Sequence, residues 1–500
     1  MNIFSRLKQI IGEAIHKLIP YKEIEQAANF ESPVSTEMTD ALNLWAQMYM
    51  NKAPYLSQEG MKSLNIAAFV CSELSRQVTQ EMKWNITGAG KSQTGEATTN
   101  PRSDYLAEQF KGCTGSKLRE KLECGMAAGG MVVKPYPDVK NGRIYFDFVP
   151  DWSIYPVRYD GDGYITDVIF RDSYQDGKTF YTRLERQTVE GNDVRITQKC
   201  YKSTVQDTLG KPCALTEVPT WAELEPELII NNAGGRLLFG WYRAATANAV
   251  DLDTCMGSSV FARAVDCIRD ADEQYSRLMW EYEAKETAID VDPTALVQKS
   301  ARDASGRRYE MPKLNNRLFR AVDLGDEKTY NVFDPPIRDV SLLNGLNIIL
   351  CRIEDLCGLA RGTMSDTTAK EALTATQILI LKQRTYETIN ANQQALEQCL
   401  RDVIDAMNVY ADMLGLAPAG ETEVSFEWDD SVISDTSTEL EQRLRLLSSG
   451  VMSKVEIRMW YLGETRQQAE EAITQIAADN IMSMAAAQGI PGLDTGGDAE

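Results

Sequence analysis

The sequence predicts an α+β protein made of several parts. Helical periodicity covers the first roughly 125 residues and returns from Ser258 to the C-terminal region, while residues 131–202 show a period of two. The period-two runs are separated by Asn-Gly, Asp-Gly and Gly-Asn turns, which are typical of antiparallel hairpins. At about 150 residues per domain, the 500 residues predict about three domains or one elaborate fold.

Composition narrows the function classes. The chain is 43% hydrophobic and 25% charged, as expected of a folded protein, and its 73 acidic against 52 basic residues give a formal charge of −21. Proteins that grip nucleic acid are usually basic, because neutralising phosphates supplies most of their affinity. The acidic balance argues against a sequence-reading DNA binder, but it is compatible with a protein that lets DNA slide.

Cysteine and histidine usage argues against common catalytic sites. The ten cysteines are scattered without a C-x-x-C pair, so we expect free thiols in a reducing compartment. The one histidine, His16, leaves no material for a Ser-His-Asp triad, a Cys-His pair or a multi-histidine zinc site. We therefore expect no metal and no cofactor.

The first roughly 125 residues are expected to be mostly helical. Residues 1–20 carry apolar residues at helical spacing interrupted by charges, which favours a helix packed on protein over one on a membrane surface. A second helix is predicted over 63–82, with Ile66, Phe69 and Val70 on its apolar face. The Gly/Ser/Thr-rich residues 87–103 are predicted to be an exposed loop.

The central region is predicted to be one antiparallel meander of about five strands. The strands are MVVKPYP, RIYFDFVP, YITDVIFRD, TFYTRLERQTV and DVRITQKCYK. A short strand, VSFEWDD, is expected much later, at 424–430.

Two helices and a small module follow. Residues 258–287 read as a helix that starts at the serines, and 337–358 as a second helix with Asp339 as N-cap and Gly358 as its stop. Between them, 288–336 is irregular, with brief strands in RLFRAVD and TYNVFD. Two helices flanking a small module form a hairpin with a tip.

Next comes a stretch of small polar residues, GTMSDTTAKEALTATQ, before a predicted helix of roughly 40 residues. At 1.5 Å per residue this helix would be about 60 Å long, well beyond the ordinary length. The C-terminal region is predicted to be helical with a frayed end.

Three candidate chemical motifs are weak. Gly90-Lys91-Ser92 resembles the end of a P-loop, but Asn85 stands where its first glycine belongs. Residues 160–163, Asp-Gly-Asp-Gly, fit a hairpin turn better than a calcium loop. The acidic pairs Asp290/Asp292 and Asp429/Asp430 lack supporting groups and are expected to be solvated.

Several of these segments resemble the portal proteins of tailed bacteriophages, especially the siphophage-like group. The likeness lies in MVVKPYPDVKNGRIYFDFVPDWSIYPVRYDGDGYITDVIF with the following YTRLERQ, in GSSVFARAVDCIRDADEQYSRLMWEYE, in DVSLLNGLNIILCRIEDLCGLARGTMS and in KEALTATQI. Gln377 stands where many members of that family have Glu. The resemblance covers about 60–460.

The resemblance implies a mainly helical portal fold with named parts. These would be a wing at 1–257 that includes the β-meander, stem helices at 258–287 and 337–358, a clip at 288–336, a tunnel loop at 359–371, a long wing helix with a wing strand at 372–435, and a crown at 436–500.

The resemblance also implies where DNA and neighbouring subunits would lie. The residues that would face DNA from the tunnel loop are Arg361, Thr363, Ser365, Thr367, Thr368 and Lys370. The candidates for the stem or oligomer interface are Phe261, Tyr275, Trp280, Tyr282, Leu346 and Ile353, of which the three aromatic residues at 275–282 are expected to share a helical face. Small side chains let a loop approach the duplex, and an acidic wall repels phosphate, so DNA could pass without being trapped.

By resemblance, the expected function is a non-enzymatic ring of about twelve copies at one capsid vertex, through which double-stranded DNA is packaged and ejected. Expected partners are the chain itself, the terminase large subunit, a head-tail adaptor or connector, and the major capsid and scaffold proteins, with no membrane. The expected location is the virion, after assembly in the host cytoplasm. Another capsid or tail component is the main alternative, and a nuclease or NTPase is a weaker one.

Overall fold

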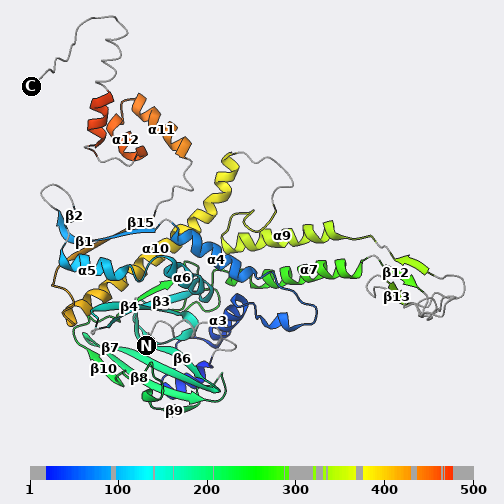
Figure 1. Ribbon diagram of the computed structural model, residues 1–500, viewed down its shortest axis with the longest axis horizontal. Coiled ribbons are helices and arrows are strands. Elements are labelled where there is room, and N and C mark those ends of the chain that lie inside the picture. Colours follow the sequence, from blue (N-terminus) through cyan, green and yellow to red (C-terminus); the bar gives the residue numbers. More distant parts are fainter. Residues whose placement is uncertain are drawn as a thin grey trace, which may run out of the picture. The chain divides into compact units, whose positions relative to one another are not determined.

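The computed structural model divides into two units, Met1–Trp428 and Asp429–Glu500, which are described separately (Figure 1). The structure describes residues 19–80, 82–91, 97–98, 100–138, 141–161, 163–206, 208–286, 288–291, 319–321, 330–333, 336–366, 375–428, 436–462, 466 and 468–476. The N-terminal helix predicted over 1–20, with His16, therefore lies almost entirely outside the described residues, as do Asp292, Asp429 and Asp430.

The first unit holds most of the helices, and their ends follow local capping chemistry. They are α2 (Tyr21–Ala28), α3 (Thr36–Tyr49), α4 (Ile66–Thr79), α5 (Pro101–Phe110), α6 (Ser116–Ala128), α7 (Val265–Ala284), α9 (Asp339–Cys357) and α10 (Ala375–Met413). Ser35 caps α3 by accepting a hydrogen bond from the Met38 amide, and Asn100 and Ser103 form a reciprocal capping box on α5. Gly129, at φ +92°, ends α6 in the left-handed region that favours glycine.

The helix predicted over 63–82 is α4, and most of its predicted face is buried. Phe69 is the exception, since it is exposed.

The prediction of an exposed loop over 87–103 is wrong in part. Strand β1 (Met82–Lys91) continues through Gly90 and Lys91 and pairs with β15 (Thr422–Trp428) and β2 (Ala97–Thr98), and α5 begins at Pro101. Gly90 and Lys91 lie within strand β1, whereas the Gly-Lys of a P-loop opens a helix, so these two residues do not have the P-loop conformation.

The prediction of a single meander is wrong, because the predicted strands are present but belong to two different sheets. The chain forms β3 (Gly130–Asp138), β4 (Arg143–Pro150), β5 (Ile154–Tyr159), β6 (Ile165–Asp176), β7 (Thr179–Glu190) and β8 (Asp193–Ser203). β3 and β4 join β11 (Gly240–Arg243) in one sheet, whereas β5–β8 join β9 (Lys211–Cys213) and β10 (Glu227–Ile230) in another. A 3-10 turn at Asp151–Ser153 separates the two sheets.

Asp160, Gly161 and Gly163 lie in a hairpin turn, as predicted for this segment. It connects β5 to β6, and the Asp160 carboxylate accepts a hydrogen bond from the Tyr164 amide at 2.9 Å. Gly163 supplies the positive φ, +81°, that the turn requires.

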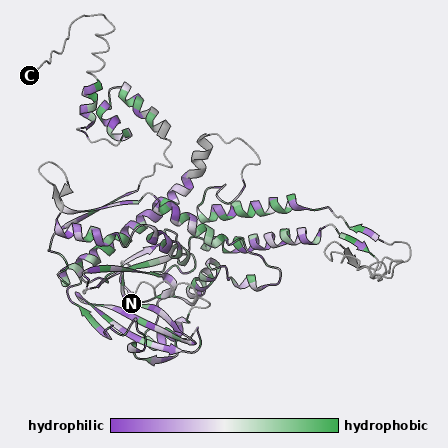
Figure 2. Ribbon diagram, in the orientation of Figure 1, coloured by the Kyte–Doolittle hydropathy of each residue, from purple (hydrophilic) through white to green (hydrophobic). Residues whose placement is uncertain are grey.

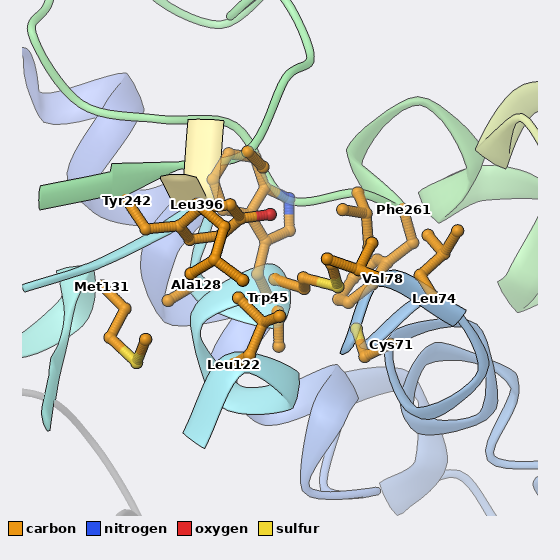
Figure 3. Close-up of a cluster of buried hydrophobic side chains, with 14 of the residues drawn as sticks. Trp45, Cys71, Leu74, Val78, Leu122, Ala128, Met131, Tyr242, Phe261 and Leu396 are labelled. Atoms are coloured by element: carbon orange, nitrogen blue, oxygen red, sulfur yellow. The ribbon is translucent and has the colours of Figure 1, made fainter. Parts of the chain in front are cut away.

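The main core consists of apolar residues from α3, α4, α6, α10 and the sheet formed by β3, β4 and β11 (Figure 3). Trp45, Tyr242, Phe261 and Leu396 meet there and are almost completely buried. Burying such side chains stabilises each by about 1.5–3 kcal/mol relative to exposure. Long-range packing of this kind joins residues from both ends of the unit into one body.

The long helix predicted from residue 372 is α10, which has 39 residues. It packs on β11 and β3 and on α4. Its side chains from Leu396 to Tyr410 that face the core are buried, as the periodicity predicted. Inside it, the Asn392 amide oxygen accepts hydrogen bonds from the Tyr242 hydroxyl and the Ala245 amide, which fixes the helix on the neighbouring strand.

The second unit contains α11 (Thr436–Ser448) and α12 (Lys454–Leu462) in its described part. The Arg443 guanidinium lies over the Trp460 ring at 4.1 Å, which joins the two helices. Helical structure is thus present where the sequence predicts it. Within the described residues, no helix has the length and apolar character needed to span a bilayer.

Candidate functional site: a helix hairpin and an anchored loop

Helices α7 and α9 form an antiparallel hairpin that carries strands at its far end (Figure 1). The strands are β12 (Ala288–Val291), β13 (Phe319–Ala321) and β14 (Tyr330–Phe333), so both brief strands predicted in the module are present. Asp290, expected to be solvated, is instead buried in the central strand β12.

The first helix of the hairpin begins later than predicted. Ser258 and Ser259 are buried, and the chain passes through a 3-10 turn at Ala262–Ala264 before α7 starts. α9 runs from Asp339 to Cys357, so Asp339 is its first residue and not its N-cap, while Gly358 is the stop that the sequence predicts, with φ +71°. A side chain at Gly358 would collide with Thr388 of α10, so glycine is required there for both conformation and space.

Polar contacts hold the two helices together and attach them to the rest of the unit. Glu281 is buried and accepts hydrogen bonds from the Arg338 guanidinium at 3.0 and 3.3 Å, and this hydrogen bonding lowers the pKa of Glu281. Asp272 accepts hydrogen bonds from the Leu64 amide at 2.7 Å and the Tyr55 hydroxyl at 3.0 Å. Burial raises the pKa of Asp272 despite these donors.

Hydrophobic residues alternate with hydrophilic ones along both helices of the hairpin (Figure 2), and several of the hydrophobic side chains are exposed. The exposed apolar residues of the two helices and their junction are Trp280, Tyr282, Ile337, Val340, Leu343 and Ile348. Trp280 is 64% exposed and Val340 is 66% exposed. Large exposed apolar side chains that gather on one element mark surfaces that other molecules cover.

The six predicted interface residues separate into two groups. Phe261, Leu346 and Ile353 are buried in the core of their own chain and are therefore not on the surface of the single chain. Tyr275 is half-buried against that core, and Trp280 and Tyr282 are exposed. Trp280 also does not share a face with Tyr275, because five residues turn an α-helix by about 140°.

The loop after α9 is folded back onto the helix around one buried carboxylate, Glu354. Its Oε1 accepts hydrogen bonds from the amides of Met364 (2.5 Å) and Ser365 (2.9 Å). Its Oε2 accepts from the Ser365 hydroxyl (2.6 Å) and the Gly362 amide (3.3 Å). We call residues 358–366 the anchored loop.

Two further contacts fix the same loop. The Asn347 side chain accepts from the Asp366 amide at 2.7 Å and donates to the Asp366 carbonyl at 3.0 Å. Arg361 forms a two-pronged contact with Asp355, the nearer pair being 2.7 Å apart, and Arg384 of α10 contacts the same carboxylate. The Arg361 hydrogen bond lowers the pKa of Asp355.

These contacts change how the predicted DNA-facing residues are arranged. Ser365 is buried and its hydroxyl is engaged by Glu354, so it is not available to face DNA in this conformation. Arg361 is exposed but ion-paired, and Thr363 is half-buried and donates to the Ala360 carbonyl. Thr367, Thr368 and Lys370 lie outside the described residues.

Sequence reasoning missed Glu354, Asn347 and Asp355. A single Glu or Asn in a helix usually faces solvent, so the pattern gave no reason to place them against a loop. One signal was available in the sequence. The residues after Gly358 carry backbone amides and side-chain hydroxyls, and such donors need acceptors if the segment is buried. In the part of the chain that the structure describes, no group of three or more His, Cys, Asp or Glu residues could hold a metal ion.

The sequence matches one known protein family. Residues 114–484 match the family described as "Phage portal protein, SPP1 Gp6-like". No curated protein gives a significant match. Among solved structures, a chain from "Virion of native gene transfer agent (GTA) particle" is 11% identical, with a TM-score of 0.38, and the match covers 88% of this chain and 98% of that one.

A chain from "Neck of native GTA particle computed with C12 symmetry" is 10% identical, with a TM-score of 0.34, over 87% of this chain and 97% of that one. The family match covers most of the sequence, including the hairpin, the anchored loop and α10. The chain therefore belongs to the phage portal protein family of the SPP1 Gp6-like type.

Proposed function

We propose that this portal protein assembles into a ring of about twelve copies at one capsid vertex, and that double-stranded DNA passes through the ring during packaging and ejection. The family match over residues 114–484 carries this proposal. The exposed apolar residues of the hairpin support it, because an isolated chain would leave Trp280 and Val340 in water. The protein acts as a structural channel rather than as an enzyme.

The proposed channel does not grip its cargo. Four acidic residues of α7 lie outside the core against two arginines, and the whole chain carries a formal charge of −21. Acidic walls repel phosphates, so DNA meets no deep binding well. We place the loop 359–371 toward DNA, with Arg361, Thr363, Thr367, Thr368 and Lys370 as its candidate contacts.

The same proposal assigns partners and place. The terminase large subunit and a head-tail adaptor or connector dock on the ring, the major capsid and scaffold proteins surround it, and the ring is built in the host cytoplasm before it becomes part of the virion. Binding of the purified ring to each purified partner, measured by mass photometry, tests these assignments one at a time.

The loop assignment is tested by changing Thr367 and Thr368 to large charged residues. Rings should still form, while packaging or retention of DNA falls. The matched control is the same pair of changes at Thr436 and Thr438, which lie outside the loop. Unchanged packaging in the loop variant would show that the loop does not lie on the DNA path.

A further inference from the structure

Two cysteines face each other across neighbouring strands, away from the hairpin. In the pairing of β8 with β9, Cys200 lies directly opposite Cys213, and their Sγ atoms are 2.9 Å apart. Opposite residues in an antiparallel pair have Cα atoms about 4.5–5.5 Å apart. A disulfide needs a Cα separation of about 4.4–6.8 Å, so the backbone already meets its main requirement.

The surroundings favour a bond within the chain over one between chains. Cys200 is buried in a small cluster with Val218 and Trp221, and Cys213 is half-buried at its edge. Only the Cys213 side is therefore open to a reagent, and its nearest sulfur is Cys200. All ten cysteines are free thiols in this structure.

We propose that Cys200 and Cys213 are a built modification site, at which an intrachain disulfide forms when the protein meets a disulfide oxidant such as oxidised glutathione. The inference does not depend on ring assembly or DNA passage. It concerns a change that a protein made in a reducing cytoplasm would undergo after release into an oxidising medium.

The reaction balances as two thiol–disulfide exchanges. Cys213 loses its proton to water, and its sulfur attacks one glutathione sulfur, which forms a mixed disulfide and releases one glutathione thiolate. Cys200 then loses its proton, and its sulfur attacks Cys213, which forms the cross-strand bond and releases the second glutathione. The two cysteines are oxidised and one glutathione disulfide is reduced.

The bond would lock a weakly held strand. β9 pairs with β8 through only three register positions, and residues 204–210 connect the two strands. A cross-link between 200 and 213 closes this connection covalently and restricts it in the unfolded chain as well. Burial raises the pKa of both thiols, so oxidation should be slow at neutral pH and should speed up as pH rises.

Peptide mapping of the purified full-length protein tests the site. The protein is reduced, freed of reductant, exposed to oxidised glutathione at mildly alkaline pH, denatured, alkylated and digested without reduction. We expect one linked species that joins the peptides of Cys200 and Cys213, with a mass lower by two hydrogens and with no dimer on a non-reducing gel. Reduction should separate the two peptides.

Two variants make the outcome decisive. Cys213→Ser should abolish the linked species, whereas the matched control Cys267→Ser, at another half-buried cysteine, should keep it. The proposal is overturned if both peptides from the wild-type protein stay alkylated, if Cys213 stops at the glutathione adduct, or if either cysteine links to a different one. Because the readout is the wild-type protein itself, poor folding of a variant cannot mask the result.

Discussion

The anchored loop depends on one carboxylate, and replacing Glu354 with Ala tests this dependence. Glu354 is fully buried and accepts four hydrogen bonds, from Gly362, Met364 and twice from Ser365. Hydrogen bonds to a charged group contribute about 1.5–3 kcal/mol each. All four donors belong to the anchored loop and can regain hydrogen bonds to water when it opens, so we expect a net local loss of about 3 kcal/mol, well below the full sum.

Amide hydrogen exchange measures this loss directly. Since about 1.4 kcal/mol corresponds to a factor of ten, the amides of Met364 and Ser365 should exchange about 100-fold faster in Glu354→Ala than in the wild type. Glu354→Gln keeps the size of the side chain and one oxygen acceptor, but its amide NH2 faces donors where the second carboxylate oxygen was. Exchange of the same amides should therefore be accelerated less, by about 10-fold.

Asp355→Asn is the matched control, because it changes the adjacent carboxylate on the same helix. It weakens the contacts of Asp355 with Arg361 and Arg384, which are exposed ion pairs of about 0–1 kcal/mol. The reasoning is refuted if Met364 and Ser365 exchange equally fast in Glu354→Ala and wild type, or if Asp355→Asn accelerates them as much.

Three further predictions follow from buried charge and exposed apolar surface. Burial raises the pKa of Asp151 to about 7, above its usual value near 4, so the folded state keeps a proton that the unfolded chain has lost. The stability of the wild type should therefore fall as pH rises from about 4 to about 7. Asp151→Asn should remove up to about 4 kcal/mol of this dependence, so that the difference in melting temperature between the variant and the wild type appears only toward pH 7. Arg102 is buried and donates hydrogen bonds to the carbonyl of Asn408 in α10 and to those of Ala417 and Pro418 just after the helix. Lysine lacks the planar guanidinium that makes these contacts, so Arg102→Lys should lower the free energy of unfolding, measured in urea, by about 2–4 kcal/mol. A loss below about 0.5 kcal/mol would contradict this account. The double variant Trp280→Glu, Val340→Glu should leave monomer stability within about 0.5 kcal/mol but prevent ring formation on a sizing column. The control Leu252→Glu changes an apolar side chain away from the hairpin that is even more exposed, and it should leave rings intact.

Much of the fold could be predicted from local patterns. The apolar period of α4, α7, α9 and α10 and the turn residues between the strands are properties of neighbouring positions, so they are visible without the structure. Gly358 was predicted as a helix stop for the same reason, and the structure confirms it.

The errors arise where distant segments decide the outcome. β1 contains NITGAGK, which has little apolar alternation, and it becomes a strand because β15 lies beside it more than 300 residues later in the chain. The period of β3–β8 shows strands but not which sheet each joins. Pro150 marks a break before the turn at Asp151–Ser153, but a proline does not show that the strands on its two sides belong to different sheets.

The candidate site was harder to predict than the fold. Leu346, Ile353 and Phe261 have the apolar character of interface residues, and only the packing of α7, α9 and α10 shows that their own chain covers them. Glu354 shows the opposite problem, because a residue type that is usually exposed is buried by a loop that follows it.

Electron microscopy of the purified full-length protein, with native mass measurement of the same sample, tests the central claim most directly. The account predicts closed rings of about twelve subunits around an open channel, with a mass about twelve times the 55.9 kDa of one chain. A sample that stays at 55.9 kDa at micromolar concentration, with no rings in the images, would contradict it.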